Sequence, residues 1–141
     1  MPNTYEEIEV GDEYATTHFI SAEDVRLFAQ VTGDDNPIHL DEAFARESRF
    51  GTRVVHGVLL LGVISKVLGH DYPGPGSIAV AMTAKFLRPV PVDSEIIVEV
   101  KVSEKIESRN QVKARVYCYL EDEGKRRMVF AGDATILPPD A

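Results

Sequence analysis

Residues 56–69 read HGVLLLGVISKVLG, and this segment gives the strongest indication of the fold. Its helical pattern is apolar on nearly every face, and only Ser65 and Lys66 are polar after His56. A helix that is apolar all round must be surrounded by protein. In a chain of 141 residues, we therefore expect this helix to be the central element of the fold.

Strands are predicted both before and after this helix in the sequence. In residues 94–103 and 111–121, apolar and polar side chains alternate with a period of two, which is typical of half-buried antiparallel strands. The other predicted elements are a strand at 77–90, a strand at 126–137, a hairpin turn at 121–125 and a weaker strand at 13–20. Together, these elements predict an α+β fold in which a curled antiparallel sheet of about five strands wraps one long buried central helix.

Shorter helices are predicted before residue 50. Ser21 is a good N-cap for a helix that starts at Ala22, with Asp24 completing a capping box. Gly33 is a natural C-terminal stop for that helix. Asp41 can cap a second, short helix through Arg46, and residues 48–55 are predicted to form a loop.

Composition excludes several classes of function. The chain is 44% hydrophobic and carries a net charge of −8, so we expect one folded domain spanning 1–141. The charge argues against nucleic acid and anionic membranes as partners. The N-terminus lacks a signal-peptide core, the longest apolar stretch is too short to span a membrane, and a single cysteine, Cys118, fits a reducing compartment. These features predict a cytoplasmic protein.

Residues 32–39, TGDDNPIH, place carboxylates, an amide and an imidazole close together. Pro37 prevents one continuous helix, so the chain must bend and Asp34 and His39 can face one pocket. A carboxylate beside an imidazole is a workable acid–base pair near neutral pH. The alternative is that Asn36 only caps a helix with Pro37 as its first residue, and that His39 is merely packed.

The start of the apolar helix is a second candidate. The backbone N–H groups near His56 and Gly57 suit an oxyanion or a polarised carbonyl, and glycine permits close approach. The alternative is that Gly57 has no role in binding and only permits tight packing. Ser65 either contacts a substrate or bonds to a carbonyl one turn earlier. His18 and His70 have no neighbours at ligand spacing, so no metal site is predicted.

Together these segments resemble the MaoC-like hydratase/dehydratase family, most closely the (R)-specific enoyl-CoA hydratases. The resemblance rests on FAQVTGDDNPIHLDEAFA, RFGTRVVHG, VLLLGVISKVLG and YPGPGSIAVAMTAKFLRPV, within residues 28–92 and the strands that follow. It implies a hot-dog fold, a homodimer or larger assembly, and an acyl-CoA thioester as substrate. Asp93 and Ser94 depart from the Gly-Asp that the family often has, and Asp35 departs from an apolar residue or proline.

The resemblance also implies the roles of the site residues. The catalytic residues would be Asp34, His39 and Asn36, and the substrate-binding residues would be Gly57, Ser65 and His56. The implied reaction adds water reversibly to trans-2-enoyl-CoA and gives (R)-3-hydroxyacyl-CoA, with no cofactor, since coenzyme A is part of the substrate. The alternatives are a 3-hydroxyacyl-ACP dehydratase, a hydratase of a short branched dicarboxylic acyl-CoA, and a non-catalytic acyl-CoA-binding hot-dog module.

Overall fold

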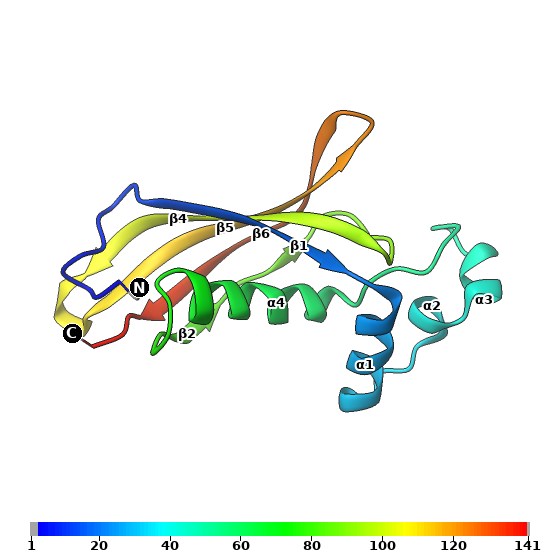
Figure 1. Ribbon diagram of the computed structural model, residues 1–141, viewed down its shortest axis with the longest axis horizontal. Helices are drawn as coiled ribbons and strands as arrows, with labels where there is room; N and C mark the ends of the chain where they lie inside the picture. Colours follow the sequence, from blue (N-terminus) through cyan, green and yellow to red (C-terminus); the bar gives the residue numbers. More distant parts are fainter. Residues whose placement is uncertain (1–2, 141) are drawn as a thin grey trace.

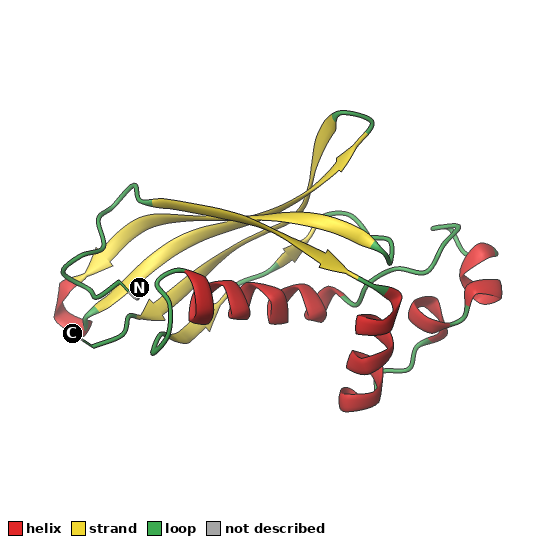
Figure 2. Ribbon diagram, in the orientation of Figure 1, coloured by secondary structure: helices red, strands yellow, loops and turns green. Residues whose placement is uncertain are grey.

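A six-stranded antiparallel sheet curls over one helix in the computed structural model, which describes residues 3–140. The strand order is β1-β4-β5-β6-β2, and β3 also pairs with β6. The strands are β1 (Glu13–Ile20), β2 (Ile78–Met82), β3 (Lys85–Phe86), β4 (Ser94–Ile106), β5 (Gln111–Asp122) and β6 (Lys125–Leu137). Figure 2 shows the sheet as one layer and the central helix as the other. The predicted α+β arrangement is confirmed.

The central helix, α4 (Gly57–Lys66), packs against the concave face of the sheet and continues into a π-helical turn, Val67–Asp71. Its buried side chains belong to the same core as the inward residues of β4, β5 and β6. The opposite face is not covered within one chain, since Val58 is 58% exposed and Gly62 and Ser65 are also exposed. The expectation that protein surrounds the helix is therefore met on one face only.

Three helices form an extension at one end of the sheet: α1 (Ala22–Thr32), α2 (Pro37–Leu40) and α3 (Glu42–Arg46). The predicted capping box is present, because the Ser21 hydroxyl accepts from Asp24 N and the Asp24 carboxylate accepts from Ser21 N. Gly33 ends α1 in the left-handed conformation with φ of 81°. The predicted cap of the short helix is also confirmed, with Asp41 accepting from Phe44 N at 3.1 Å.

The predicted strand at 77–90 is divided into β2 and β3, which raises the number of strands to six. The division occurs at Thr83, between the end of β2 and the start of β3. The Thr83 hydroxyl accepts a hydrogen bond from Asp133 N at 3.0 Å. A side-chain oxygen therefore replaces a backbone carbonyl as the acceptor at this point of the strand pairing. The Thr83 carbonyl also lies directly against Gly132, where any Cβ would collide. A side-chain acceptor of this kind leaves no trace in hydrophobic periodicity.

Short turns complete the fold. A 3₁₀ turn, Glu107–Arg109, connects β4 to β5, and the predicted hairpin connects β5 to β6. Within residues 3–140, no helix combines the length and apolarity needed to cross a bilayer.

Candidate active site

The site begins where the chain leaves α1. After the left-handed Gly33, the backbone N–H of Asp34 bonds the Thr32 hydroxyl at 3.1 Å, which turns the following segment back. Asn36 then starts α2, with its side-chain oxygen accepting from Ile38 N at 3.2 Å and Pro37 as the first helical residue. Asn36 therefore caps α2, and its catalytic role stays a prediction. This cap also fixes α2, which carries His39 back towards Asp34.

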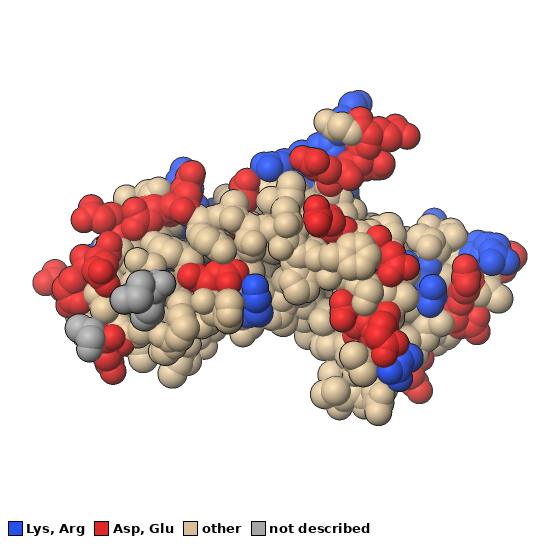
Figure 3. Space-filling view, viewed as in Figure 1, with Lys and Arg blue, Asp and Glu red and all other residues tan. Residues whose placement is uncertain are grey.

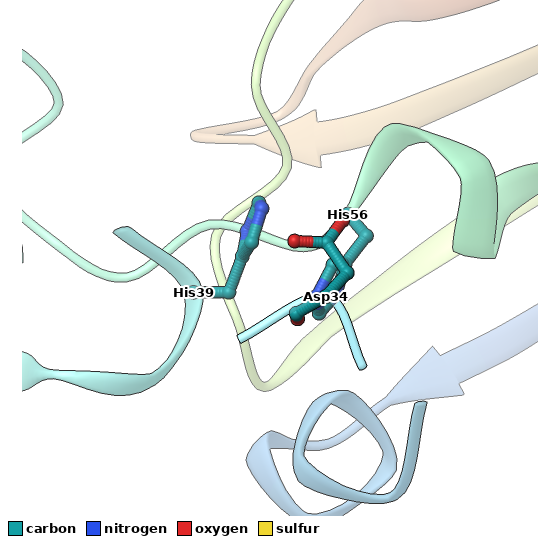
Figure 4. A group of neighbouring side chains, drawn as sticks. All are labelled: Asp34, His39 and His56. Atoms are coloured by element: carbon teal, nitrogen blue, oxygen red, sulfur yellow. The ribbon is translucent and has the colours of Figure 1, made fainter. Parts of the chain in front are cut away.

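Asp34, His39 and His56 converge from three separate segments (Figure 4). One oxygen or nitrogen atom from each side chain lies within 4.8 Å of the others. A single water molecule can bridge atoms at this separation with two ordinary hydrogen bonds of about 2.8 Å. Asp34 is exposed and His39 is half-buried, so water has access to the pair. The bend predicted at Pro37 thus brings both side chains to one place.

The tautomer of His39 follows from its partner. Its Nδ1 lies 2.7 Å from the carbonyl oxygen of Val54, an atom that can only accept. Nδ1 must therefore carry the hydrogen and donate it to Val54. The other ring nitrogen, Nε2, is left with a lone pair that can take a proton and return it. A fixed tautomer of this kind suits an acid–base group.

His56 lies beneath His39 in the interior. Its side chain is 2% exposed, and its ring stacks on His39 with centroids 3.8 Å apart. Phe28 contacts the same imidazole at 4.7 Å between centroids. The Nε2 atom lies 3.0 Å from the backbone oxygen of Asp34. Direct contact between His56 and a substrate stays a prediction.

Gly57 is the first residue of α4, so its backbone N–H has no acceptor within the helix. A Cβ at this position would lie 3.0 Å from the ring of Phe86. Both sequence interpretations of Gly57 are thus compatible with the structure, because the glycine permits close packing and also leaves a donor at a helix start. The donor role stays a prediction.

The chain matches the family described as MaoC like domain over residues 5–123. It belongs to this family. The 3-hydroxybutyryl-CoA dehydratase of Methylorubrum extorquens is 40% identical over 135 residues, which cover 96% of this chain and 83% of that protein. The (R)-specific enoyl-CoA hydratase of Rhodospirillum rubrum is 35% identical, with 96% and 91% covered.

The solved structures show the same fold for this MaoC-like domain. The unliganded R-hydratase PhaJ1 from Pseudomonas aeruginosa superposes with a TM-score of 0.90 at 37% identity, covering 99% of this chain and 88% of that one. The hot-dog fold is therefore confirmed. The expectation of a hydro-lyase is confirmed as well, since relatives that span nearly the whole chain are named hydratases and dehydratases.

Ser65 is not brought to the cluster of this MaoC-like domain. It lies eight residues after Gly57 on α4, which corresponds to about 12 Å along the helix axis. Its side chain is exposed on the uncovered face of the helix. Contact between Ser65 and a substrate stays a prediction, and it requires a ligand that extends along this face.

The three clustered side chains are poorly arranged for a shared metal ion. The rings of His39 and His56 are close to parallel, with 27° between their planes. Because ring-nitrogen lone pairs lie in the ring plane, stacked imidazoles cannot both direct them at one nearby ion. This geometry supports the prediction that no metal is required, which stays a prediction.

Sequence reasoning missed two groups that shape the site. The carbonyl of Val54 fixes the tautomer of His39, and the ring of Phe28 packs against His56. Val54 acts through its backbone, so its residue type carries no signal. Phe28 lies within the predicted first helix, and nothing in its spacing indicates an imidazole as its neighbour.

Proposed function

We propose that this MaoC-like domain catalyses the reversible addition of water to trans-2-enoyl-CoA, giving (R)-3-hydroxyacyl-CoA. The observation that carries this proposal is the convergence of Asp34 and His39 at a spacing that one water can bridge, beside the start of α4. Hydration requires a base for the water, a proton for C2 and a donor for the thioester oxygen. The three requirements correspond to Asp34, His39 and the Gly57 N–H.

The proposed mechanism adds the hydroxyl group of one water molecule to C3 and a proton to C2. The Asp34 carboxylate accepts a proton as the water oxygen bonds to C3 of the substrate. The electron pair of the C2–C3 double bond moves towards the thioester oxygen, and the Gly57 N–H stabilises the developing charge. Asp34 then passes this proton to Nε2 of His39, which delivers it to C2 as the enolate electron pair returns from the thioester oxygen to form the C2–H bond. In this proposal, Asn36 orients the water or the Asp34 carboxylate.

The names of the relatives support CoA thioesters as the substrate class. One relative is named for dehydration of 3-hydroxybutyryl-CoA and another for (R)-specific hydration of enoyl-CoA. Hydration and dehydration are the two directions of one reaction, so the same residues serve both. The proposed (R) configuration rests on the names of the relatives, because the distances in the cluster do not reveal which face of the alkene meets Asp34.

We also propose that the protein works as a homodimer or larger homo-oligomer. The strand β2 ends the sheet, and its apolar residues Ile78 and Val80 are 59% and 52% exposed. An apolar edge strand needs covering. On the uncovered face of α4, Val58 is 58% exposed, and a second copy of this chain would cover both places.

The proposed reaction is tested by mixing the protein with crotonyl-CoA and following loss of the conjugated thioester absorbance. We expect turnover, with (R)-3-hydroxybutyryl-CoA on chiral analysis. An (S) product would overturn the stereochemistry. No turnover with crotonyl-CoA, together with turnover of crotonyl-ACP, would favour the acyl-carrier-protein dehydratase, and inactivity with both would contradict the proposed function.

A further inference from the structure

Two histidine rings fasten the segment around Asp34 to the segment before α4. His39 Nδ1 donates to Val54 O at 2.7 Å, and His56 Nε2 lies 3.0 Å from Asp34 O. The backbone N–H of Val54 also donates to Ile38 O at 3.2 Å. Each segment thus contributes one imidazole that bonds the backbone of the other. The mechanism above uses only one of these two rings.

The hydrogen on His56 can be placed from its surroundings. The Asp34 carbonyl can only accept, so Nε2 of His56 must donate. The second nitrogen, Nδ1, is buried and has no hydrogen-bond partner among the described residues. A proton on Nδ1 would be a buried donor without an acceptor, which is unfavourable. The geometry therefore favours a neutral ring with hydrogen on Nε2 alone.

We propose that His56 is a positioning residue for the hydration reaction, a buried neutral imidazole that holds Asp34 through its backbone and His39 through ring stacking. This proposal rests on the proposed function. His56 is also the N-cap residue of α4, directly before Gly57. One residue therefore connects the base, the proton carrier and the N–H donor for the thioester oxygen.

Stacking gives His56 a specific part in the reaction. When His39 takes up a proton, its cationic ring lies 3.8 Å from the face of a ring that stays neutral. A cation over an aromatic face is stabilised. His56 does not exchange protons itself, because its donor nitrogen is occupied by a carbonyl and its other nitrogen faces no partner.

Two substitutions at His56 separate its two contacts. His56→Phe keeps an aromatic ring against His39 and removes the donor to Asp34. His56→Gln can keep an N–H near the same carbonyl and removes the ring. We expect kcat for crotonyl-CoA to fall roughly tenfold to a hundredfold in each variant, with KM changed less than threefold. His70→Gln, at an exposed histidine outside the cluster, is the matched control and should retain full kcat.

Activity must be expressed per folded molecule, measured by circular dichroism at the assay temperature. Unchanged kcat per folded molecule in both variants, with only a lower Tm, would overturn the proposal and leave His56 with a purely structural role. A loss in His56→Phe as large as that in His39→Ala, with no activity retained by His56→Gln, would assign His56 to proton transfer and also contradict it.

Nitrogen-15 NMR of the wild-type histidine rings provides a test that needs no activity. At pH 8, where imidazoles are ordinarily neutral, we expect His56 to carry its hydrogen on Nε2 and His39 on Nδ1. The His56 signal is identified by its loss in His56→Phe. Hydrogen on Nδ1 of His56 would refute the proposal. If crotonyl-CoA is not hydrated but this tautomer pair is found, the proposed function fails while the arrangement of the two rings is confirmed.

Discussion

At the scale of single residues, the side chains of Asp34 and His39 are more accessible than the core beneath them, so their removal should affect catalysis more than folding. We expect Asp34→Asn and His39→Ala each to lower kcat by roughly a hundredfold or more, the loss typical of an acid–base group. Steady-state kinetics with crotonyl-CoA checks this.

Asp35→Asn is the matched control for this pair, because Asp35 is an exposed carboxylate next to Asp34 and outside the cluster. We expect it to change kcat less than threefold. Near-normal turnover in either Asp34→Asn or His39→Ala would remove the proposed mechanism, and circular dichroism spectra should show that both variants remain folded.

A substitution at Gly57 has two effects that must be separated. A Cβ would block the approach of the thioester oxygen, and it would also lie 3.0 Å from the ring of Phe86. Valine at this position would confound the two, so alanine is the better test. We expect Gly57→Ala to lower kcat at least tenfold, because the hydrogen bond to the thioester oxygen strengthens as the enolate forms.

The double variant Gly57→Ala with Phe86→Leu serves as the control. Phe86 is 49% exposed, so a smaller side chain there removes the contact at modest cost to stability. We expect the kcat loss to persist in this background, relative to Phe86→Leu alone. Full recovery of kcat would show that the alanine acts through packing and would remove the proposed oxyanion role.

Cys118 illustrates a residue whose burial decides its chemistry. The side chain is fully buried on β5, and burial raises the pKa of its thiol to about 12. The reactive thiolate is therefore on the order of one part in ten thousand at pH 8. We expect no alkylation of Cys118 by iodoacetamide in the native protein and rapid alkylation in urea, measured by mass spectrometry. Cys118→Ala should cost about 1–2 kcal/mol and leave kcat unchanged.

At the scale of elements, Asp93 connects the start of β4 to the start of α1. Its Oδ1 accepts from Ala22 N at 2.9 Å, and its backbone is left-handed with φ of 60°. Glycine adopts that conformation without strain, whereas aspartate does not. Asp93 adopts this strained conformation, and its carboxylate accepts a hydrogen bond from one of the free N–H groups at the start of α1.

We expect Asp93→Ala to destabilise the protein by about 1–2 kcal/mol, because it removes the acceptor and retains the strain. Asp93→Asn is the matched control, since asparagine tolerates a positive φ and keeps a side-chain oxygen. Urea unfolding measures both. Equal midpoints for the alanine and asparagine variants would show that the bond to Ala22 N contributes nothing.

At the scale of the whole molecule, acidic groups outnumber basic ones, as the net charge of −8 requires. On the face shown in Figure 3, Lys and Arg are dispersed and form no continuous basic surface. Exposed large apolar side chains include Ile78 and Val80 on the edge strand β2 and Val58 on α4. A second copy of the chain covers such surfaces without requiring opposite charge.

We therefore expect at least a dimer by light scattering at micromolar concentration. Val80→Lys places a charge on the exposed side of β2 and should shift the protein to monomer, because a buried unpaired charge is strongly unfavourable. Val10→Lys, at another exposed apolar position outside these surfaces, is the control and should leave the mass unchanged. A monomeric wild-type mass would contradict the proposed assembly.

Features that depend on neighbours along the chain were predictable without a structure. Periodicity predicted the strands and the central helix, and the caps at Ser21, Gly33 and Asp41 were predicted because each bonds within about four residues. The motif around Asp34 and His39 was likewise visible, because Pro37 forces a local bend.

The groups that meet across long stretches of chain could be identified only from the folded structure. The bond from His56 to Asp34 O joins residues 22 apart, and the bond from His39 to Val54 O joins residues 15 apart. Both use a backbone carbonyl, which every residue type carries. The side chain of Thr83, where the predicted strand at 77–90 is divided, bonds across 50 residues. Pairings of this kind depend on how the sheet and helices pack, and no local pattern encodes them.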